Sequence, residues 1–115
     1  MLTPKELQEK RRMLGETDAR IAAAFKALGD VTRLRIFRIL TDSPEESVST
    51  IAAILDLSLP LTSQHIKALA QAQLLTKNRT GKKIFSRLDR KNPVVRELIR
   101  AVSQAMRSKE LIPKI

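Results

Sequence analysis

No cysteine and only one histidine, His65, occur among the 115 residues of this chain. The absence of cysteine excludes disulfide bonds, thiolate metal ligands and cysteine nucleophiles within the chain. A zinc site needs three or four converging ligands, and one histidine without cysteine does not supply them. We therefore expect no metal site and no cofactor. Two roles are open to His65: contact with a partner, or packing in a half-buried position.

Aromatic side chains and long apolar segments are also scarce. With three phenylalanines and no tryptophan or tyrosine, the core must consist of leucine, isoleucine, valine and alanine, which suits packed helices better than a β-sandwich. No apolar stretch approaches the roughly 18 residues that span a bilayer. The first residues lack the apolar core of a signal peptide. We expect a cytoplasmic protein in which residues 1–115 form a single domain.

No group of side chains forms a catalytic pattern. The acidic residues of the first expected helix and of the segment 42–46 lie away from His65 in the sequence. Neither a Ser/His/Asp arrangement nor a carboxylate pair is visible. We expect no catalytic residues and no enzymatic activity.

Basic residues outnumber acidic ones by 22 to 12, which gives a formal net charge of +10. Residues 76–91 hold seven basic side chains and one acidic one, a net charge of +6, whereas residues 41–47 carry −3. Such a concentrated patch indicates a polyanionic partner, either nucleic acid or an anionic membrane surface. A solvated basic face without a partner is the alternative.

Apolar periodicity and capping residues predict a mainly helical fold. Helical segments are placed near 3–14, 17–28, 30–40, 47–55, 58–69 and 92–108. The expected helix caps are Thr3, either Thr17 or Asp18, Asp30, either Ser47 or Ser49, Ser58 and Asn92. The expected buried stripes of the second and third segments are Ile21, Phe25 and Leu28, and Val31, Leu34, Phe37 and Leu40. The expected fold has about five helices and a small β-hairpin.

Residues 47–88 follow the order of a winged helix-turn-helix. Two short helices joined by Asp56–Ser58 come first, and two strand candidates, 75–78 and 84–88, then flank a turn with Gly81 at its tip. Such a unit places its second helix in the major groove of DNA, and its two-stranded wing lies along the phosphate backbone. The +6 patch coincides with this wing.

Three segments resemble the ArsR/SmtB family of winged-helix repressors. Ala27–Ile36 is similar to the family's Ala-Leu-(Ala/Gly)-Asp-Pro-Thr-Arg-Leu-Arg-Ile, with Val31 in place of proline. Ser58–Leu69 is similar to its recognition helix, often Ser-Gln-Pro-Ala-Val-Ser-Gln-His-Leu-Lys-Val-Leu, and Gly81–Leu88 resembles its wing strand. The resemblance implies a homodimer that binds a pseudo-palindromic operator, with terminal helices at the dimer interface.

The chain departs from the family where other members sense metals. Residues 48–51 lack paired cysteines, and the last expected helix, 93–108, lacks the aspartate and histidine ligands. Gln73 stands where the family usually has glycine, which predicts a different end for the recognition helix. Lys83 and Ser86 replace aromatic residues and make the wing more polar. The resemblance thus implies the DNA-binding fold without a zinc, cadmium or arsenite response.

The candidate DNA contacts lie in the recognition helix and the wing. Gln64 can bond an adenine edge in two places, and Ser63 can reach a phosphate or a base. The apolar Leu59 and Leu61 are less usual in such a helix, but an apolar side chain can contact thymine methyl groups. Wing cations add affinity and salt dependence but little sequence discrimination. Arg33 and Arg35 can serve either as phosphate contacts or as braces of the fold. The expected DNA-binding residues are Leu59, Thr62, Ser63, Gln64, His65, Lys67, Lys77, Arg79, Lys82 and Lys83.

The terminal helices are the candidate dimer interface, because the apolar side of the last helix is broader than one small core requires. Burial within the subunit is the alternative. The expected dimerisation residues are Leu7, Val95, Leu98, Ile99, Val102 and Met106.

These features predict a sequence-specific transcriptional repressor that acts as a homodimer without metal or thiol sensing. Its expected partners are double-stranded DNA and a second copy of itself, with no membrane and with any small-molecule or protein effector unknown. The alternative is a winged-helix module that binds a protein or an anionic surface. The apolar Leu59-Pro60-Leu61 at the recognition surface supports that alternative.

Overall fold

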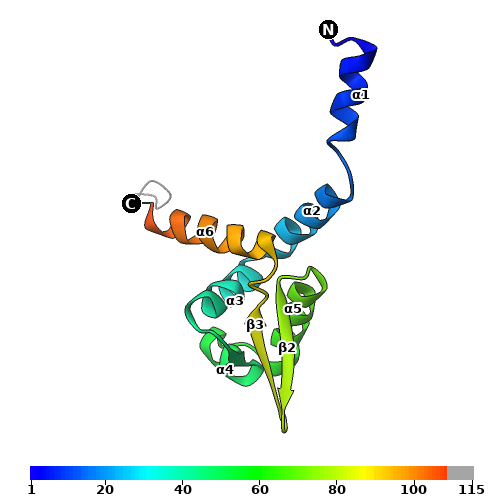
Figure 1. Cartoon of the computed structure of the whole chain (residues 1–115). Helices are drawn as coiled ribbons and strands as arrows, with labels where there is room; N and C mark the ends of the chain where they lie inside the picture. The colour runs from blue at the N-terminus through cyan, green and yellow to red at the C-terminus, as the bar shows by residue number, and fades with distance from the viewer. Residues whose placement is uncertain (109–115) are drawn as a thin grey trace.

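Figure 1 shows the computed structural model of the chain, which describes residues 1–108. Within these residues the chain forms six helices and a three-stranded sheet. The elements in order are α1 (Pro4–Arg12), α2 (Glu16–Leu28), α3 (Val31–Asp42), β1 (Glu46–Ser47), α4 (Val48–Leu55), α5 (Leu59–Gln71), β2 (Leu75–Thr80), β3 (Lys83–Leu88) and α6 (Pro93–Arg107). The predicted winged helix-turn-helix architecture is confirmed, with six helices rather than about five.

Five of these six helices begin at a side-chain cap that the sequence predicts. The caps are Thr3, Asp30, Ser47, Ser58 and Asn92. Each accepts a hydrogen bond from a backbone N–H of the first turn, a group that would otherwise have no partner inside the helix. The prediction for α2 was wrong. Its N-cap is Gly15, whose N–H donates to the Asp18 carboxylate at 2.9 Å.

The core lies where α2, α3, α4 and α5 meet the base of the sheet and the first half of α6. Its largest fully buried side chains are Ile36, Phe37, Leu40, Ile51, Ile66, Leu69, Leu74 and Val95. Phe25 and Val31 were expected in buried stripes, but both are exposed. The helix α2 packs through Ala24 and Ala27, so Phe25 projects from another side, and Val31 lies at the first position of α3, beyond the core.

The sheet is antiparallel with the strand order β1-β3-β2. The two wing strands pair from Leu75 opposite Leu88 to Thr80 opposite Lys83. At the tip, Gly81 has a φ of 62°, a left-handed conformation that glycine adopts without steric cost. The expected hairpin has an additional partner, because Glu46 pairs with Ser86 and extends the sheet to three strands.

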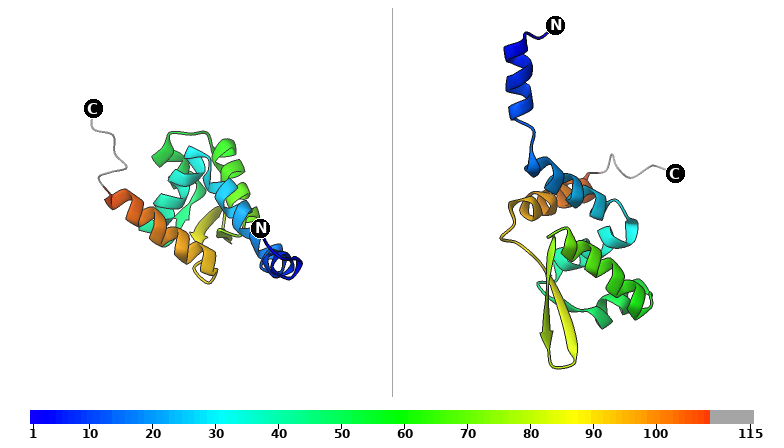
Figure 2. Two further views of the ribbon diagram at one scale, coloured as in Figure 1. Left: turned by 90° about the horizontal axis from the view of Figure 1, so that it is seen from above. Right: turned by 90° about the vertical axis from the view of Figure 1, so that its right-hand side faces the viewer.

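Helix α1 projects from the body of the molecule, on the opposite side from the wing tip (Figures 1 and 2). No residue of α1 is buried. The radius of gyration is 17.6 Å, whereas a compact domain of this size has about 13 Å. None of the helices in residues 1–108 is long and apolar enough to cross a membrane. Helix α1 is therefore capped by its own sequence but has no packing partner within the described part of the subunit.

Candidate nucleic-acid interface

The turn between α4 and α5 is fixed by local hydrogen bonds. Asp56 ends α4 in the left-handed conformation, with a φ of 54°, and the N–H of Leu57 donates to the Ala52 carbonyl at 3.0 Å. The next helix then begins at once, because the Ser58 hydroxyl accepts a hydrogen bond from the N–H of Leu61 at 3.2 Å. The predicted turn is confirmed, and it sets the direction in which α5 leaves α4.

One face of α5 is anchored in the core and the opposite face is open. Ile66 and Leu69 are buried as expected, and each contributes about 1.5–3 kcal/mol to holding the helix in place. At 3.6 residues per turn, Gln64 and Lys67 project from the other side, and both are exposed. Ser63 is exposed beside them. The helix thus presents donors and acceptors on a rigid support.

Thr62 was expected to contact DNA, and this prediction was wrong. The residue belongs to the buried face of α5 and is fully covered. Its hydroxyl donates to the Ser58 carbonyl at 2.9 Å. Thr62 therefore strengthens the start of the helix and is not available to a ligand.

His65 lies on the flank of α5 next to the N-terminus of α3. Its side chain is 18% exposed, and Nδ1 lies 3.8 Å from Oδ2 of Asp30. The same carboxylate accepts the N–H of Arg33 at 3.0 Å. That hydrogen bond is the main cause that lowers the pKa of Asp30, and the charges of Arg33 and His65 lower it further. Of the two roles open to His65, half-buried packing fits this position.

Arg33 braces the fold. Its Nε donates to the Ala27 carbonyl at 2.6 Å, and Nη2 reaches the Lys26 carbonyl at 3.5 Å. These carbonyls belong to the last turn of α2, where a cation is favourable because the helix dipole is negative there. Arg35, in contrast, is exposed.

The wing carries most of its side chains in solvent. Only its base is buried, at Leu75, Ser86 and Leu88. The cations Lys77, Arg79, Lys82 and Lys83 are all exposed, and none of them pairs with a carboxylate of the described residues. The wing is therefore a projecting cationic ribbon, available to phosphates.

Known regulators resemble this chain in sequence. A sequence model described as "Helix-turn-helix domain" matches residues 28–78. The transcriptional regulator KmtR of Mycobacterium tuberculosis is 35% identical over 79 residues, which are 69% of this chain and 58% of the regulator. The arsenical resistance operon repressor of Escherichia coli is 38% identical over 64 residues, 56% of this chain and 55% of the repressor. The chain thus spans little more than half the length of these relatives.

Two solved structures resemble the fold of this chain. HlyU from Vibrio cholerae matches with a TM-score of 0.72 at 25% identity, over 79% of this chain and 96% of HlyU. A homodimeric winged helix-turn-helix DNA-binding domain from Mycobacterium bovis, a possible ArsR-family regulator, matches with a TM-score of 0.66 at 25% identity, over 83% of this chain and 92% of that domain. The chain is thus similar, in sequence and in fold, to winged helix-turn-helix regulators of the ArsR type.

The sequence difference from the family at Gln73 has a structural counterpart. Helix α5 ends at Gln71, and Gln73 adopts a φ of 64°, where most side chains are strained. Asn92 supports this turn, because its Nδ2 donates to the Gln73 carbonyl at 3.0 Å while its Oδ1 accepts the N–H of Val94 at 3.0 Å. The ArsR-type recognition helix therefore ends in a turn without its usual glycine.

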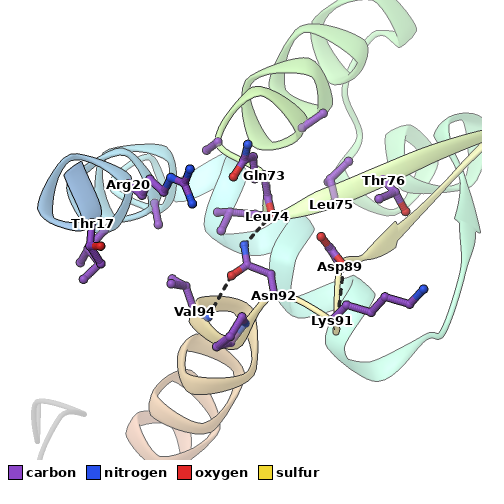
Figure 3. A pocket seen from close by; sticks show the side chains of 15 residues that line it. Thr17, Arg20, Gln73, Leu74, Leu75, Thr76, Asp89, Lys91, Asn92 and Val94 are labelled. Carbon is purple, nitrogen blue, oxygen red and sulfur yellow. Dashed lines mark hydrogen bonds between the residues drawn. The ribbon is translucent and has the colours of Figure 1, made fainter.

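A groove of about 650 Å³ lies beside this turn, between α2, the end of α5, the start of β2 and the start of α6 (Figure 3). Leu74 and Val94 contribute apolar surface to it, and Arg20 extends from α2 toward Gln73. Within residues 1–108, no three histidine or acidic side chains lie close enough together to hold a metal ion. The groove thus lies at the junction of α2, the end of α5 and the start of α6.

The expected dimer residues divide into two groups. Val95 and Leu98 are buried in the core of the subunit, so assigning them to a dimer interface was wrong. Ile99 and Val102 are partly buried, whereas Leu7 and Met106 are exposed. Helix α6 packs on the winged unit as far as Val102, and its C-terminal end carries the exposed Met106 at the edge of the body (Figures 1 and 2).

Proposed function

We propose that this ArsR-type chain is a sequence-specific DNA-binding regulator that acts as a homodimeric repressor on a pseudo-palindromic operator. The observation that carries this proposal is the exposed polar row Ser63, Gln64 and Lys67 on α5, beside a cationic wing. The buried face of α5 holds this row in a fixed direction, as direct readout of base edges requires.

The two parts of the interface have different tasks. Gln64 bonds an adenine edge in the major groove, and Leu59, Ser63 and Lys67 contact neighbouring bases and phosphates. Lys77, Arg79, Lys82 and Lys83 of the wing neutralise phosphates, which adds affinity on every sequence. His65 supports the recognition helix from its flank.

Regulation in this proposal requires neither metal nor thiol. The chain has no cysteine. Among the described acidic side chains, only that of Asp30 lies within 4.0 Å of a His65 ring nitrogen. Zinc, cadmium, arsenite and oxidants at micromolar concentrations should leave the DNA affinity unchanged. Stoichiometric zinc binding with release of DNA would contradict this part of the proposal.

The test begins with selection of binding sites from random duplexes, followed by shift assays on the selected site and on random DNA. Gln64→Ala should cost about 1–3 kcal/mol on the selected site and little on random DNA. Replacing Lys82 and Lys83 with alanine should weaken both and reduce the dependence on salt. An equal loss on every sequence for Gln64→Ala would contradict base reading by this residue.

A second candidate function is binding of a protein or an anionic surface, which the exposed Leu59 and Leu61 favour. It predicts that selection from random duplexes returns no preferred sequence. The same experiment therefore separates the two functions.

A further inference from the structure

Leu61 is an exposed apolar side chain in the first turn of α5, next to the exposed Leu59 and one turn before the polar Gln64. It is the third residue of α5 and is 40% exposed. Its backbone is held by the cap, since its N–H donates to the Ser58 hydroxyl at 3.2 Å. The side chain thus leaves the first turn of the helix in a fixed direction, although it is not part of the core.

The position of Leu61 relative to Gln64 defines what it can touch. Residues three apart on a helix are surface neighbours, with Cβ atoms about 5–6 Å apart. Side chains on a helix also tilt toward its N-terminus, so Leu61 covers the tip that enters a groove first. A group that Gln64 contacts therefore has Leu61 beside it, one turn closer to the helix start.

The major groove offers one apolar group to such a side chain, the C5-methyl of thymine. Successive base pairs are about 3.4 Å apart along the axis, so a spacing of 5–6 Å corresponds to one or two base pairs. We infer that Leu61 is a specificity-determining residue that contacts the methyl group of a thymine one or two base pairs from the adenine bound by Gln64. This inference rests on the proposed function and specifies its base preference.

Replacement of thymine by deoxyuridine tests the inference directly, because it removes the methyl group and keeps every hydrogen bond. The selected site is synthesised with deoxyuridine at one thymine position per half-site, and affinity is measured in shift assays. When the substituted thymine is the one that Leu61 contacts, the affinity of the unaltered protein should fall about fourfold for each substituted half-site. This is the effect expected for the loss of one buried methyl group. This measurement needs no protein variant.

Protein variants then assign the effect to Leu61. Leu61→Ala should lose affinity for the thymine site and become insensitive to deoxyuridine. Ile54→Ala is the matched control, because Ile54 is an exposed aliphatic side chain on α4. This variant should bind like the unaltered protein and retain the deoxyuridine effect. Circular dichroism checks that both variants remain helical.

The outcomes distinguish this inference from the function on which it rests. If deoxyuridine has no effect at any position while Gln64→Ala still loses the selected site, the protein is a DNA reader and the role of Leu61 is wrong. A folded Leu61→Ala variant that keeps the deoxyuridine effect would also overturn it. If no duplex is preferred over random DNA, the proposed function itself fails.

Discussion

Nδ1 of His65 lies 3.8 Å from Oδ2 of Asp30, which connects the flank of the recognition helix to the N-cap of α3. The same Asp30 oxygen accepts the N–H of Arg33 at 3.0 Å. One carboxylate therefore starts α3 and faces the histidine of α5. In the helix-turn-helix unit this contact joins elements whose main connection is otherwise apolar packing.

Asp30→Asn and Asp30→Ala should separate the cap from the charge. Asparagine keeps the capping oxygen and removes the charge, whereas alanine removes both. We expect both variants to lower the urea midpoint at neutral pH, and alanine to lower it more. If the two variants have the same urea midpoint, the capping hydrogen bond contributes nothing to stability beyond the charge of Asp30.

The contribution of the Asp30 charge should depend on pH in one direction. The N–H of Arg33 lowers the pKa of this carboxyl in the folded state, so the stabilisation is present above the unfolded pKa, about 3.9. It is lost as the pH falls through the lower folded pKa. The difference in urea midpoint between the unaltered protein and Asp30→Asn should therefore shrink below about pH 4. A constant difference between pH 7 and pH 3 would contradict this assignment.

Gln73→Gly should stabilise the protein by about 0.5–1 kcal/mol. A left-handed residue other than glycine costs about 1–2 kcal/mol, and the extra entropy of glycine in the unfolded chain offsets part of the gain. The hydrogen bond from Asn92 is retained, because it ends on the backbone carbonyl of residue 73.

Gln71→Gly is the matched control, since Gln71 is exposed in the last turn of α5. This control should destabilise by up to about 1 kcal/mol. Urea unfolding measures both, and destabilisation by both would contradict strain at Gln73.

Features that depend on neighbouring residues could be predicted from the sequence. The caps at Thr3, Asp30 and Ser58 act within one turn of helix, and the turn at Gly81 needs only the adjacent residues. The helix-turn-helix, the wing and the exposed Gln64 follow from such local signals.

Features that depend on distant segments could not be predicted. The strand β1 exists because Glu46 meets Ser86, forty residues later in the chain. The hydrogen bonds of Arg33 to α2 depend on how two helices pack. The apolar side of α6 was visible in the sequence, but periodicity does not say whether the same subunit or a partner covers Leu98.

We expect the dimer to depend on the C-terminal end of α6 and on α1. Met106 is 50% exposed, and α1 has an exposed Leu7 but no buried residue. A partner that covers such side chains gains up to about 1.5–3 kcal/mol for each one fully buried, and two-fold symmetry doubles every contact. We therefore expect Met106→Glu and Leu7→Glu to shift the protein from dimer to monomer while its helical content is kept.

Leu98→Glu provides the contrast. Leu98 is only 8% exposed and belongs to the subunit core. We therefore expect this variant to disrupt the fold of each subunit, so that cooperative unfolding is lost together with the dimer. In a dimer, two recognition helices lie about 34–36 Å apart and face successive major grooves. The monomeric variants should therefore lose most of their affinity for a palindrome and retain binding to a half-site. Sedimentation at tens of micromolar, combined with shift assays, measures both effects. If the unaltered protein sediments as a monomer and still binds a palindrome tightly, the terminal helices do not form the interface proposed for them.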